Sequence, residues 1–343
     1  MRMTKQISEL RNKMMSFLRS LGFMLFAAFV PWMVYGACFE FEQDNGKALF
    51  YFAEHEVEKG DPEAECALIW IHGMNGGSSD AARVLRKKLA ASAEGRKVYC
   101  IAPSFNTSAA LKNPDMREKT LLWDKENWRG GGRASNGEAG SFELVDRLCQ
   151  KLVDRAKYPR LRRIVIAGFS AGGQFVGRYV AVGRPPQAEG VRYSFVAGGP
   201  SSYLYIDKRR MQDGKFAVPA DPDPKFNGWR YGLDRRGGYA GQLSPEEIMA
   251  NLTSRPVLYL CGDADTDTKG KSLDKSPAAM LEGKNRYERF QIFQKYTELF
   301  PEWRKRLRFV SVPGAGHDRR RVVFGRPEFL AILLGSEDAP SGK

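Results

Sequence analysis

A serine lies between glycines in the sequence Gly-Phe-Ser-Ala-Gly at residues 168–172. An apolar, strand-like run over 164–167 precedes it, and a helical pattern begins at residue 171. A G-x-S-x-G sequence in this setting is typical of a sharp strand-to-helix turn, which strains the backbone of the serine and exposes its hydroxyl. Small residues two positions before and after the serine let neighbouring backbone approach without a clash. We therefore predict that Ser170 is a nucleophile.

A serine hydroxyl attacks a carbonyl carbon only when a nearby base removes its proton. The chain contains three histidines, and two of them, His55 and His72, precede the serine, in or at the end of early strands. His317 follows a strand-like run over 309–312, within a flexible Gly-Ala-Gly-His sequence. Because such a loop at the end of the last strand can bring an imidazole over Ser170, we predict that His317 is the general base.

A third group must orient the histidine, and an aspartate after the preceding strand can do this. The apolar run over 257–261 is followed by Asp263, Asp265 and Asp267. The G-x-x-D spacing from Gly262 selects Asp265, with Asp267 as the alternative and Asp263 as the third choice. The two aspartates that are not used would form or cap turns. The resulting order along the chain, Ser then Asp then His, is that of the α/β-hydrolases.

Stabilising the charge that develops on a substrate carbonyl oxygen requires two N–H groups aimed at it. The N–H of Ala171, directly after the nucleophile, is one candidate. The other is the N–H of Met74 in the glycine-rich segment 72–77, with Asn75 as the alternative donor. We expect His72 to brace this segment by hydrogen bonding. Asn75 and Phe169 are also predicted to contact the substrate.

Strand-like and helical patterns alternate along the chain, which favours a three-layer α/β fold with a mostly parallel central sheet. The predicted strands lie at 39–42, 47–53, 67–71, 98–102, 163–167, 194–197, 256–261 and 307–312, and the predicted helices at 79–90, 142–156, 171–182, 286–300 and 327–334. Three long segments, near 104–140, 200–245 and 263–285, follow the carboxyl ends of strands, where ligands bind in such sheets. We interpret these insertions as walls or a lid for the site.

The first 37 residues differ from the rest of the chain. Basic residues precede an uncharged apolar run over 21–35, and the small residues Gly36 and Ala37 follow. This pattern predicts a signal peptide at 1–37 and an exported protein, periplasmic or secreted, with a single catalytic domain at 38–343. The alternatives are an uncleaved N-terminal membrane anchor and lipid attachment at Cys38.

Composition restricts the remaining possibilities. Hydrophobic residues make up 43% of the 343, as in a globular protein, and the formal net charge is +14. No nucleic-acid-binding motif accompanies the basic residues, so we interpret them as solvated surface and expect no nucleic-acid partner. The five cysteines form no metal-binding pattern, and we predict neither a metal nor a cofactor. In an oxidising compartment one or two disulfides are possible, with no pairing indicated.

From about residue 68 to residue 334 the chain resembles the α/β-hydrolase superfamily. More narrowly, it is similar to a little-characterised group of secreted bacterial and fungal serine hydrolases. The shared segments lie at 141–143, 173–179, 200–205, 229–233 and 273–279. Phe169 departs from that group, which often has histidine at this position.

The resemblance implies hydrolysis of a small or polymeric carboxylic ester through an acyl-enzyme. An amidase or peptidase with the same three residues is an alternative, since the same attack cleaves amides. A catalytically silent binding module is a third hypothesis. It requires none of the nucleophile, base, acid and glycine loops together, so the sequence disfavours it.

Overall fold

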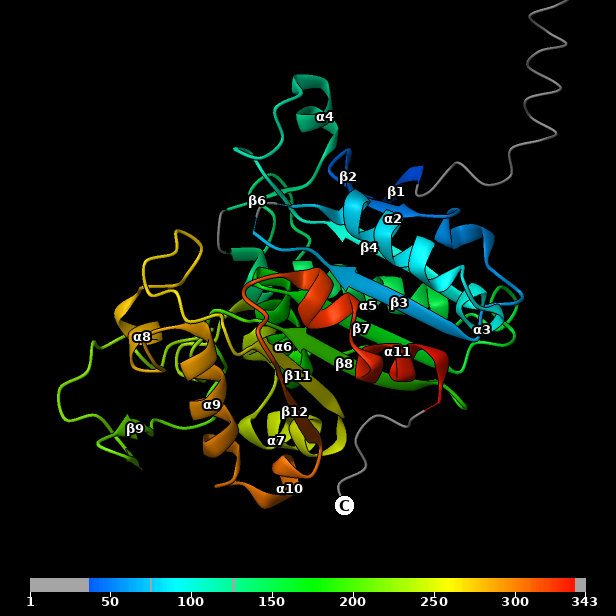
Figure 1. Ribbon diagram of the computed structural model, residues 1–343. Coiled ribbons are helices and arrows are strands. Elements are labelled where there is room, and N and C mark those ends of the chain that lie inside the picture. Colours follow the sequence, from blue (N-terminus) through cyan, green and yellow to red (C-terminus); the bar gives the residue numbers. More distant parts are fainter. Residues whose placement is uncertain (1–36, 75, 125–126, 337–343) are drawn as a thin grey trace, which may run out of the picture. The chain divides into compact units, whose positions relative to one another are not determined.

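The computed structural model describes residues 37–336 apart from 75 and 125–126, so nearly all of the predicted leader at 1–37 lies outside the described residues. An eight-stranded sheet forms the centre, in the order β1-β2-β4-β3-β7-β8-β11-β12 (Figure 1). Its strands are β1 (Ala37–Asp44), β2 (Lys47–Ala53), β3 (Cys66–Ile71), β4 (Val98–Ser104), β7 (Arg163–Phe169), β8 (Arg192–Gly198), β11 (Val257–Gly262) and β12 (Leu307–Val312).

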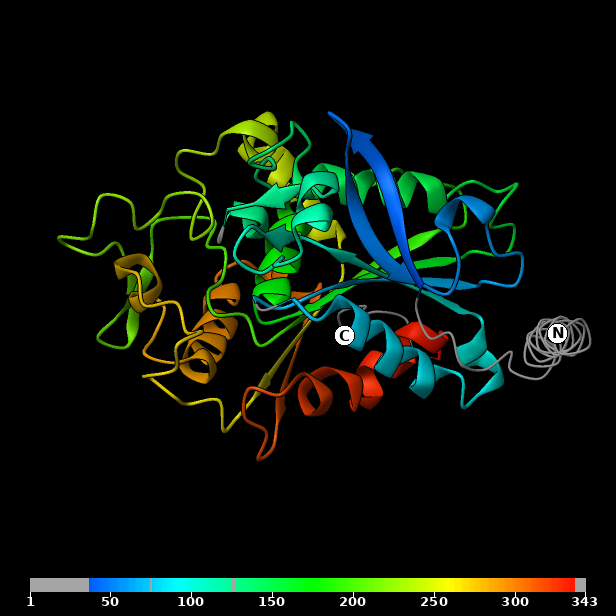
Figure 2. The same cartoon turned by 90° about the horizontal axis from the view of Figure 1, so that it is seen from above.

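Six neighbouring strands of this sheet are mutually parallel, namely β4, β3, β7, β8, β11 and β12. At one edge, β2 pairs antiparallel with both β4 and β1. Helices cover both faces (Figure 2). On one face lie α2 (Ser78–Leu89) and α11 (Pro327–Leu334), and on the other lie α5 (Ser141–Leu152), α6 (Ala171–Val182), α7 (Pro245–Ser254) and α9 (Arg286–Thr297). The predicted fold class, a mostly parallel sheet between two helical layers, is confirmed.

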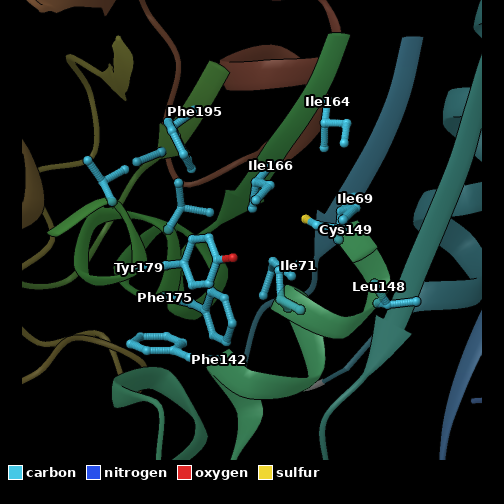
Figure 3. Close-up of a cluster of buried hydrophobic side chains, with 14 of the residues drawn as sticks. Ile69, Ile71, Phe142, Leu148, Cys149, Ile164, Ile166, Phe175, Tyr179 and Phe195 are labelled. Atoms are coloured by element: carbon cyan, nitrogen blue, oxygen red, sulfur yellow. The ribbon is translucent and has the colours of Figure 1, made fainter. Parts of the chain in front are cut away.

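Alternation of side chains along each strand explains the two cores. In β3, Ile69 and Ile71 belong to the cluster under α5 and α6, while Leu68 and Trp70 belong to the cluster under α2 and α11. All six residues of this strand are buried, as expected for a central parallel strand. Figure 3 shows part of the larger cluster, in which the ring of Tyr179 packs between α6 and Phe195 of β8, and Phe175 of α6 packs against Phe142 of α5.

Two predicted helices end earlier than expected. The helix predicted over 142–156 is α5, which ends at Leu152, and the helix predicted over 286–300 is α9, which ends at Thr297. The chain then turns into the short α10 (Pro301–Arg304). Pro301 explains the second difference, because proline disfavours helical backbone at the residue before it and supplies no N–H.

The three predicted insertions contain only short elements. The first contains β5 (Asn106–Thr107), α4 (Pro114–Lys119), β6 (Leu122–Trp123) and η2 (Asn127–Gly130); the second contains β9 (Arg210–Gln212), β10 (Lys215–Ala217) and η3 (Gly238–Gln242); the third contains α8 (Pro277–Met280). The remaining short elements are η1 (Val57–Lys59), α3 (Ala93–Arg96) and the π-helical turn η4 (Arg320–Phe324). In Figure 1, β9, α8 and α9 gather at one side of the domain.

All five cysteines lie within the described residues, and each carries a free thiol. Four of them are buried, and Cys38 is exposed. Between residues 37 and 336, leaving aside the undescribed positions, no helix has the length and apolar character needed to cross a membrane.

Candidate active site

Ser170 occupies the sharp turn between β7 and α6. Its backbone has φ 60° and ψ −115°, a conformation that L-residues rarely adopt and that costs about 1–3 kcal/mol. Two hydrogen bonds hold the turn: the Ser170 N–H donates to the Gly198 carbonyl at 2.8 Å, and the Gln174 N–H donates to the Ser170 carbonyl at 3.0 Å. Two hydrogen bonds therefore hold the strained backbone of this turn, which places the Ser170 hydroxyl at the carboxyl ends of the parallel strands.

The two flanking glycines are required by close backbone contacts. A Cβ atom at Gly168 would lie 2.5 Å from the Gly172 backbone, and one at Gly172 would lie 2.1 Å from the Ile71 carbonyl oxygen. Real Cβ atoms do not approach backbone this closely. The G-x-S-x-G spacing thus reflects the packing of the turn against itself and against β3.

His317 and Asp265 meet where β11 and β12 end side by side. Gly262 of β11 pairs with Val312 of β12, so the loops after the two strands start from neighbouring positions. The His317 Nδ1 atom lies 2.6 Å from Oδ2 of Asp265. The Asp265 side chain is only 4% exposed and that of His317 24%. A proton on Nδ1 is donated to the carboxylate, which leaves the lone pair of Nε2 available to accept another proton.

The other two aspartates hold local turns. Asp263 Oδ1 accepts a hydrogen bond from the Gly314 N–H at 2.7 Å, and Asp267 Oδ1 accepts one from the Lys269 N–H at 2.7 Å. Neither carboxylate is paired with His317. Of the three aspartates, Asp265 is therefore the one whose carboxylate contacts His317.

The His317 ring lies against the turn that carries Ser170. Its centroid is 4.6 Å from that of Phe169, the residue directly before Ser170. A Cβ atom at Gly199 would lie 3.3 Å from the His317 ring and 3.0 Å from the Phe169 ring, so only glycine fits between them without displacing one. Phe169 therefore forms a wall beside the histidine, and the Ser170 turn and the His317 loop lie together at the carboxyl ends of the parallel strands.

The glycine-rich segment after β3 passes next to Ser170. A Cβ atom at Gly73 would lie 3.8 Å from Cβ of Ser170. The Gly76 N–H donates to the Gly73 carbonyl at 3.1 Å and closes a tight turn around Met74, which is half-buried. Asn75, the alternative donor, lies outside the described residues. Ala171 is buried at the first position of α6.

His72 braces this segment, as the sequence predicts. Its Nδ1 lies 2.6 Å from the Gly73 carbonyl oxygen, and its Nε2 accepts the N–H of Phe105 at 2.9 Å. Both ring nitrogens are therefore used by backbone, and burial lowers the pKa of this imidazole. His55 is separate from the site, because it stacks on Tyr99 and lies 3.8 Å from Asp61.

Buried polar side chains attach the insertions to α6, and the sequence analysis predicted no role for them although some lie in the shared segments 173–179 and 200–205. Arg129 donates to Gln174, whose amide donates to the Ser202 hydroxyl at 3.1 Å. Arg178 donates to the same hydroxyl at 2.9 Å and to the Arg230 carbonyl at 2.9 Å. Burial lowers the pKa of Arg178 to about 9. No periodicity or motif in the sequence marks these pairs, because their partners are far apart along the chain.

A second missed residue lies behind the aspartate. Nη1 of Arg286, the first residue of α9, is 3.5 Å from Oδ1 of Asp265, and both side chains are almost fully buried. Within the described residues, no group of three or more His, Cys, Asp or Glu side chains could hold a metal ion.

No protein-family model matches the sequence, and no curated protein matches it. Solved structures do. LpqC, a poly(3-hydroxybutyrate) depolymerase from Bordetella parapertussis, has a TM-score of 0.55 and 21% identity over 82% of this chain and 85% of its own. Poly(aspartic acid) hydrolase-1 from Sphingomonas sp. KT-1 has a TM-score of 0.57 and 22% identity over 88% of this chain and 96% of its own. The described part of this chain therefore has the α/β-hydrolase fold.

Proposed function

We propose that the protein is a serine hydrolase of carboxylic esters that acts outside the cytoplasm. Ser170 is the nucleophile, His317 the general base and Asp265 the residue that orients the histidine. The N–H groups of Ala171 and Met74 form the oxyanion hole. The observation that carries the proposal is the 2.6 Å hydrogen bond between His317 and Asp265 beside the strained serine turn.

The first half of the reaction forms an acyl-enzyme. Oγ of Ser170 bonds to the ester carbonyl carbon while its proton passes to Nε2 of His317. The carbonyl oxygen takes up the electron pair as an oxyanion, which the two N–H groups stabilise. When the carbonyl re-forms, the ester C–O bond breaks and the alcohol leaves with the proton from Nε2.

The second half uses water as the nucleophile. His317 removes a proton from the water while its oxygen bonds to the acyl carbon. The bond to Oγ then breaks, the acid is released and Ser170 regains its proton. Throughout both halves Asp265 keeps the proton on Nδ1 and stabilises the imidazolium form.

The fold neighbours support hydrolysis and suggest a polymer as one kind of substrate. One is described as a depolymerase of a polyester and the other as a hydrolase of poly(aspartic acid), which is a polyamide. The second neighbour favours an amidase with the same residues as the alternative function. Export remains part of the proposal and rests on the apolar N-terminal run over 21–35.

Hydrolysis of activated esters by the purified protein and by Ser170→Ala tests the proposal. We expect the substitution to lower kcat by up to about 10⁶-fold with an unchanged fold. Ser254→Ala is the matched control. Ser254 is the last residue of α7 and precedes the start of β11, so it lies at the amino ends of the parallel strands, away from Ser170. Its hydroxyl bonds only to backbone carbonyls. Equal rates for Ser170→Ala and the unsubstituted protein would refute the assignment. Parallel assays with aminoacyl amides decide between ester and amide hydrolysis.

A further inference from the structure

Arg286 occupies an unusual place beside the proposed catalytic aspartate. Its side chain is 3% exposed, and its guanidinium bridges two segments. Nη1 lies 3.5 Å from Oδ1 of Asp265, while Nη2 donates to the carbonyl of Ser272 at 2.6 Å and to its hydroxyl at 3.1 Å. The aspartate is thus held from one side by His317 and from the other by a cation.

We propose that Arg286 is a positioning residue that fixes the Asp265 carboxylate and sets the pH at which His317 becomes a base. This inference rests on the proposed function. It adds Arg286 to the side chains of Ser170, His317 and Asp265 that the proposed function uses. Arg286 touches neither the substrate nor the reacting atoms, so it acts only through the aspartate.

The two oxygens of Asp265 have different partners, which fixes the plane of the carboxylate. Oδ2 faces Nδ1 of His317 and Oδ1 faces Arg286. The backbone of the aspartate is also held, because its N–H donates to the Gly262 carbonyl at 3.1 Å and its carbonyl accepts the Tyr287 N–H at 3.2 Å. Rotation of the carboxylate away from the histidine would break the contact with Arg286 as well.

The charge of Arg286 opposes that of a protonated His317. Both cations share one buried carboxylate, and charges interact strongly where water is excluded. Arg286 therefore makes the imidazolium less stable than it would be beside an unshared aspartate. Removing the positive charge should leave the imidazole protonated up to a higher pH, so the base would become active at a higher pH.

The other ionisable groups around this pair have partners of their own. They are Asp263 with the Gly314 N–H, Asp318 with the Arg320 N–H, Arg319 with Asp80, and Arg289 with the carbonyls of Gly283 and Ser201. The thiol of Cys261, which also lies near Asp265 and Arg286, stays neutral because burial raises its pKa. Arg286 is therefore the cation that acts most directly on the aspartate.

Arg289 provides a matched control. It lies one turn further along α9, is fully buried and also binds backbone carbonyls, but it does not contact Asp265. A purely structural role would make the two arginines equivalent. A positioning role predicts that only Arg286 changes the titration of His317 strongly.

The test is a titration of the histidine rings by NMR in the full chain carrying Ser170→Ala, with and without Arg286→Met or Arg289→Met. The chain contains only three histidines, so their ring signals can be assigned by substitution. We expect Arg286→Met to raise the pH midpoint of the His317 titration by roughly one unit and Arg289→Met by less than half as much. If Arg286→Met fails to fold, Arg286→Gln, which keeps a donor for Ser272 without the charge, gives the same comparison.

The midpoint of kcat/KM against pH should move in the same direction in the active enzyme. Arg286→Lys, which keeps the charge, should leave that midpoint nearly unchanged. Equal shifts of the His317 midpoint in Arg286→Met and Arg289→Met, or no shift in Arg286→Met, would overturn the inference. Because the titration is read in an inactive background, its outcome is independent of whether the chain hydrolyses esters. A protein with the expected shift but no Ser170-dependent hydrolysis would refute the proposed function instead.

Discussion

The body of the sheet and the side that carries the candidate site are held together by different interactions. Between the sheet and its helices, buried residues are aliphatic and aromatic (Figure 3). Among the described residues, the buried charged side chains avoid the strands of the central sheet; they are Arg129, Arg178, Arg210, Asp265, Glu282, Arg286 and Arg289. These side chains belong to the insertions or to loops and helices that contact them.

Because the two regions are held by different interactions, substitutions in them should affect stability and function to different degrees. Apolar contacts are non-directional, so the body can lose a methyl group and keep its geometry. Buried charges are directional, and the loss of one partner leaves another polar group without a hydrogen bond. We expect changes in the body to alter mainly the free energy of unfolding, and changes on the insertion side to alter the site.

The largest effect is expected at the site itself. His317→Ala should lower kcat by about 10⁵–10⁶-fold, because it removes the proposed acceptor of the serine proton. Asp265→Asn should lower it by about 10⁴-fold by favouring the wrong tautomer of the imidazole. Asp267→Asn, the control among the neighbouring aspartates, should keep kcat within about threefold. Steady-state kinetics with an activated ester checks all three, and a large loss in Asp267→Asn with none in Asp265→Asn would reverse the assignment.

A pair of substitutions tests the contrast between the two regions. Leu148→Ala removes a fully buried side chain of α5 and should cost about 2–5 kcal/mol of unfolding free energy. The folded fraction should keep kcat/KM within about twofold. Arg178→Met removes the bonds from α6 to Ser202 and to the Arg230 carbonyl, and should lower kcat/KM at least about tenfold because the insertions lose their attachment.

Urea unfolding and kinetics of the two variants provide the measurement. If Leu148→Ala lowered the kcat/KM of the folded enzyme as much as Arg178→Met does, the two regions would not differ as we propose.

Much of the fold was predictable because the body follows simple patterns. Every strand of the central sheet was expected, and continuous apolar runs mark the buried central strands such as β3. The short helix α7 was missed although its signal was present: Ser244 and Glu247 form a capping box, and Pro245 stands at the first helical position.

The insertion side was not predictable to the same degree. Gln174 and Ser202 meet Arg129 and Arg178 only because the fold brings distant segments together. Arg286 is one of many basic residues, and nothing in its neighbourhood in the sequence indicates that it faces Asp265. Ser170 and His317 were easier to select, since the glycine pattern and the scarcity of histidines reduce the choice.

A pH-dependent effect should appear on the insertion side. Glu282 is fully buried and accepts the Tyr203 N–H at 2.8 Å, and burial raises its pKa to about 8, above its ordinary value of 4.5. The folded protein therefore holds this proton to a higher pH than the unfolded chain. The corresponding stability is complete below about pH 4.5 and is lost as the pH rises through about 8.

Chemical unfolding at pH 6 and pH 9 checks this expectation. The unsubstituted protein should lose on the order of 1–4 kcal/mol between these values, and Glu282→Gln should lose clearly less. Glu143→Gln, at a partly exposed carboxylate of α5, is the control and should behave like the unsubstituted protein. An identical loss in Glu282→Gln would exclude this carboxyl group as the cause.

The smallest effect is expected from His72, whose ring nitrogens bond to the backbone of Gly73 and Phe105. Because burial lowers the pKa of His72, the folded protein keeps this ring neutral while the unfolded chain takes up a proton below about pH 6.5. The stability that His72 contributes should be lost as the pH falls from about 6.5 to 5, by roughly 1–2 kcal/mol. Comparison with His72→Asn over this range tests the direction. A stability that rises on acidification only when His72 is present would contradict it.

Covalent labelling with a fluorophosphonate probe tests the central claim most directly. The probe reacts only with a serine whose hydroxyl is activated, so peptide mapping by mass spectrometry reports which serine has a base beside it. We predict a single adduct on the peptide that contains Ser170, and its loss in His317→Ala. An unlabelled protein, or an adduct on another serine that persists without His317, would contradict the account.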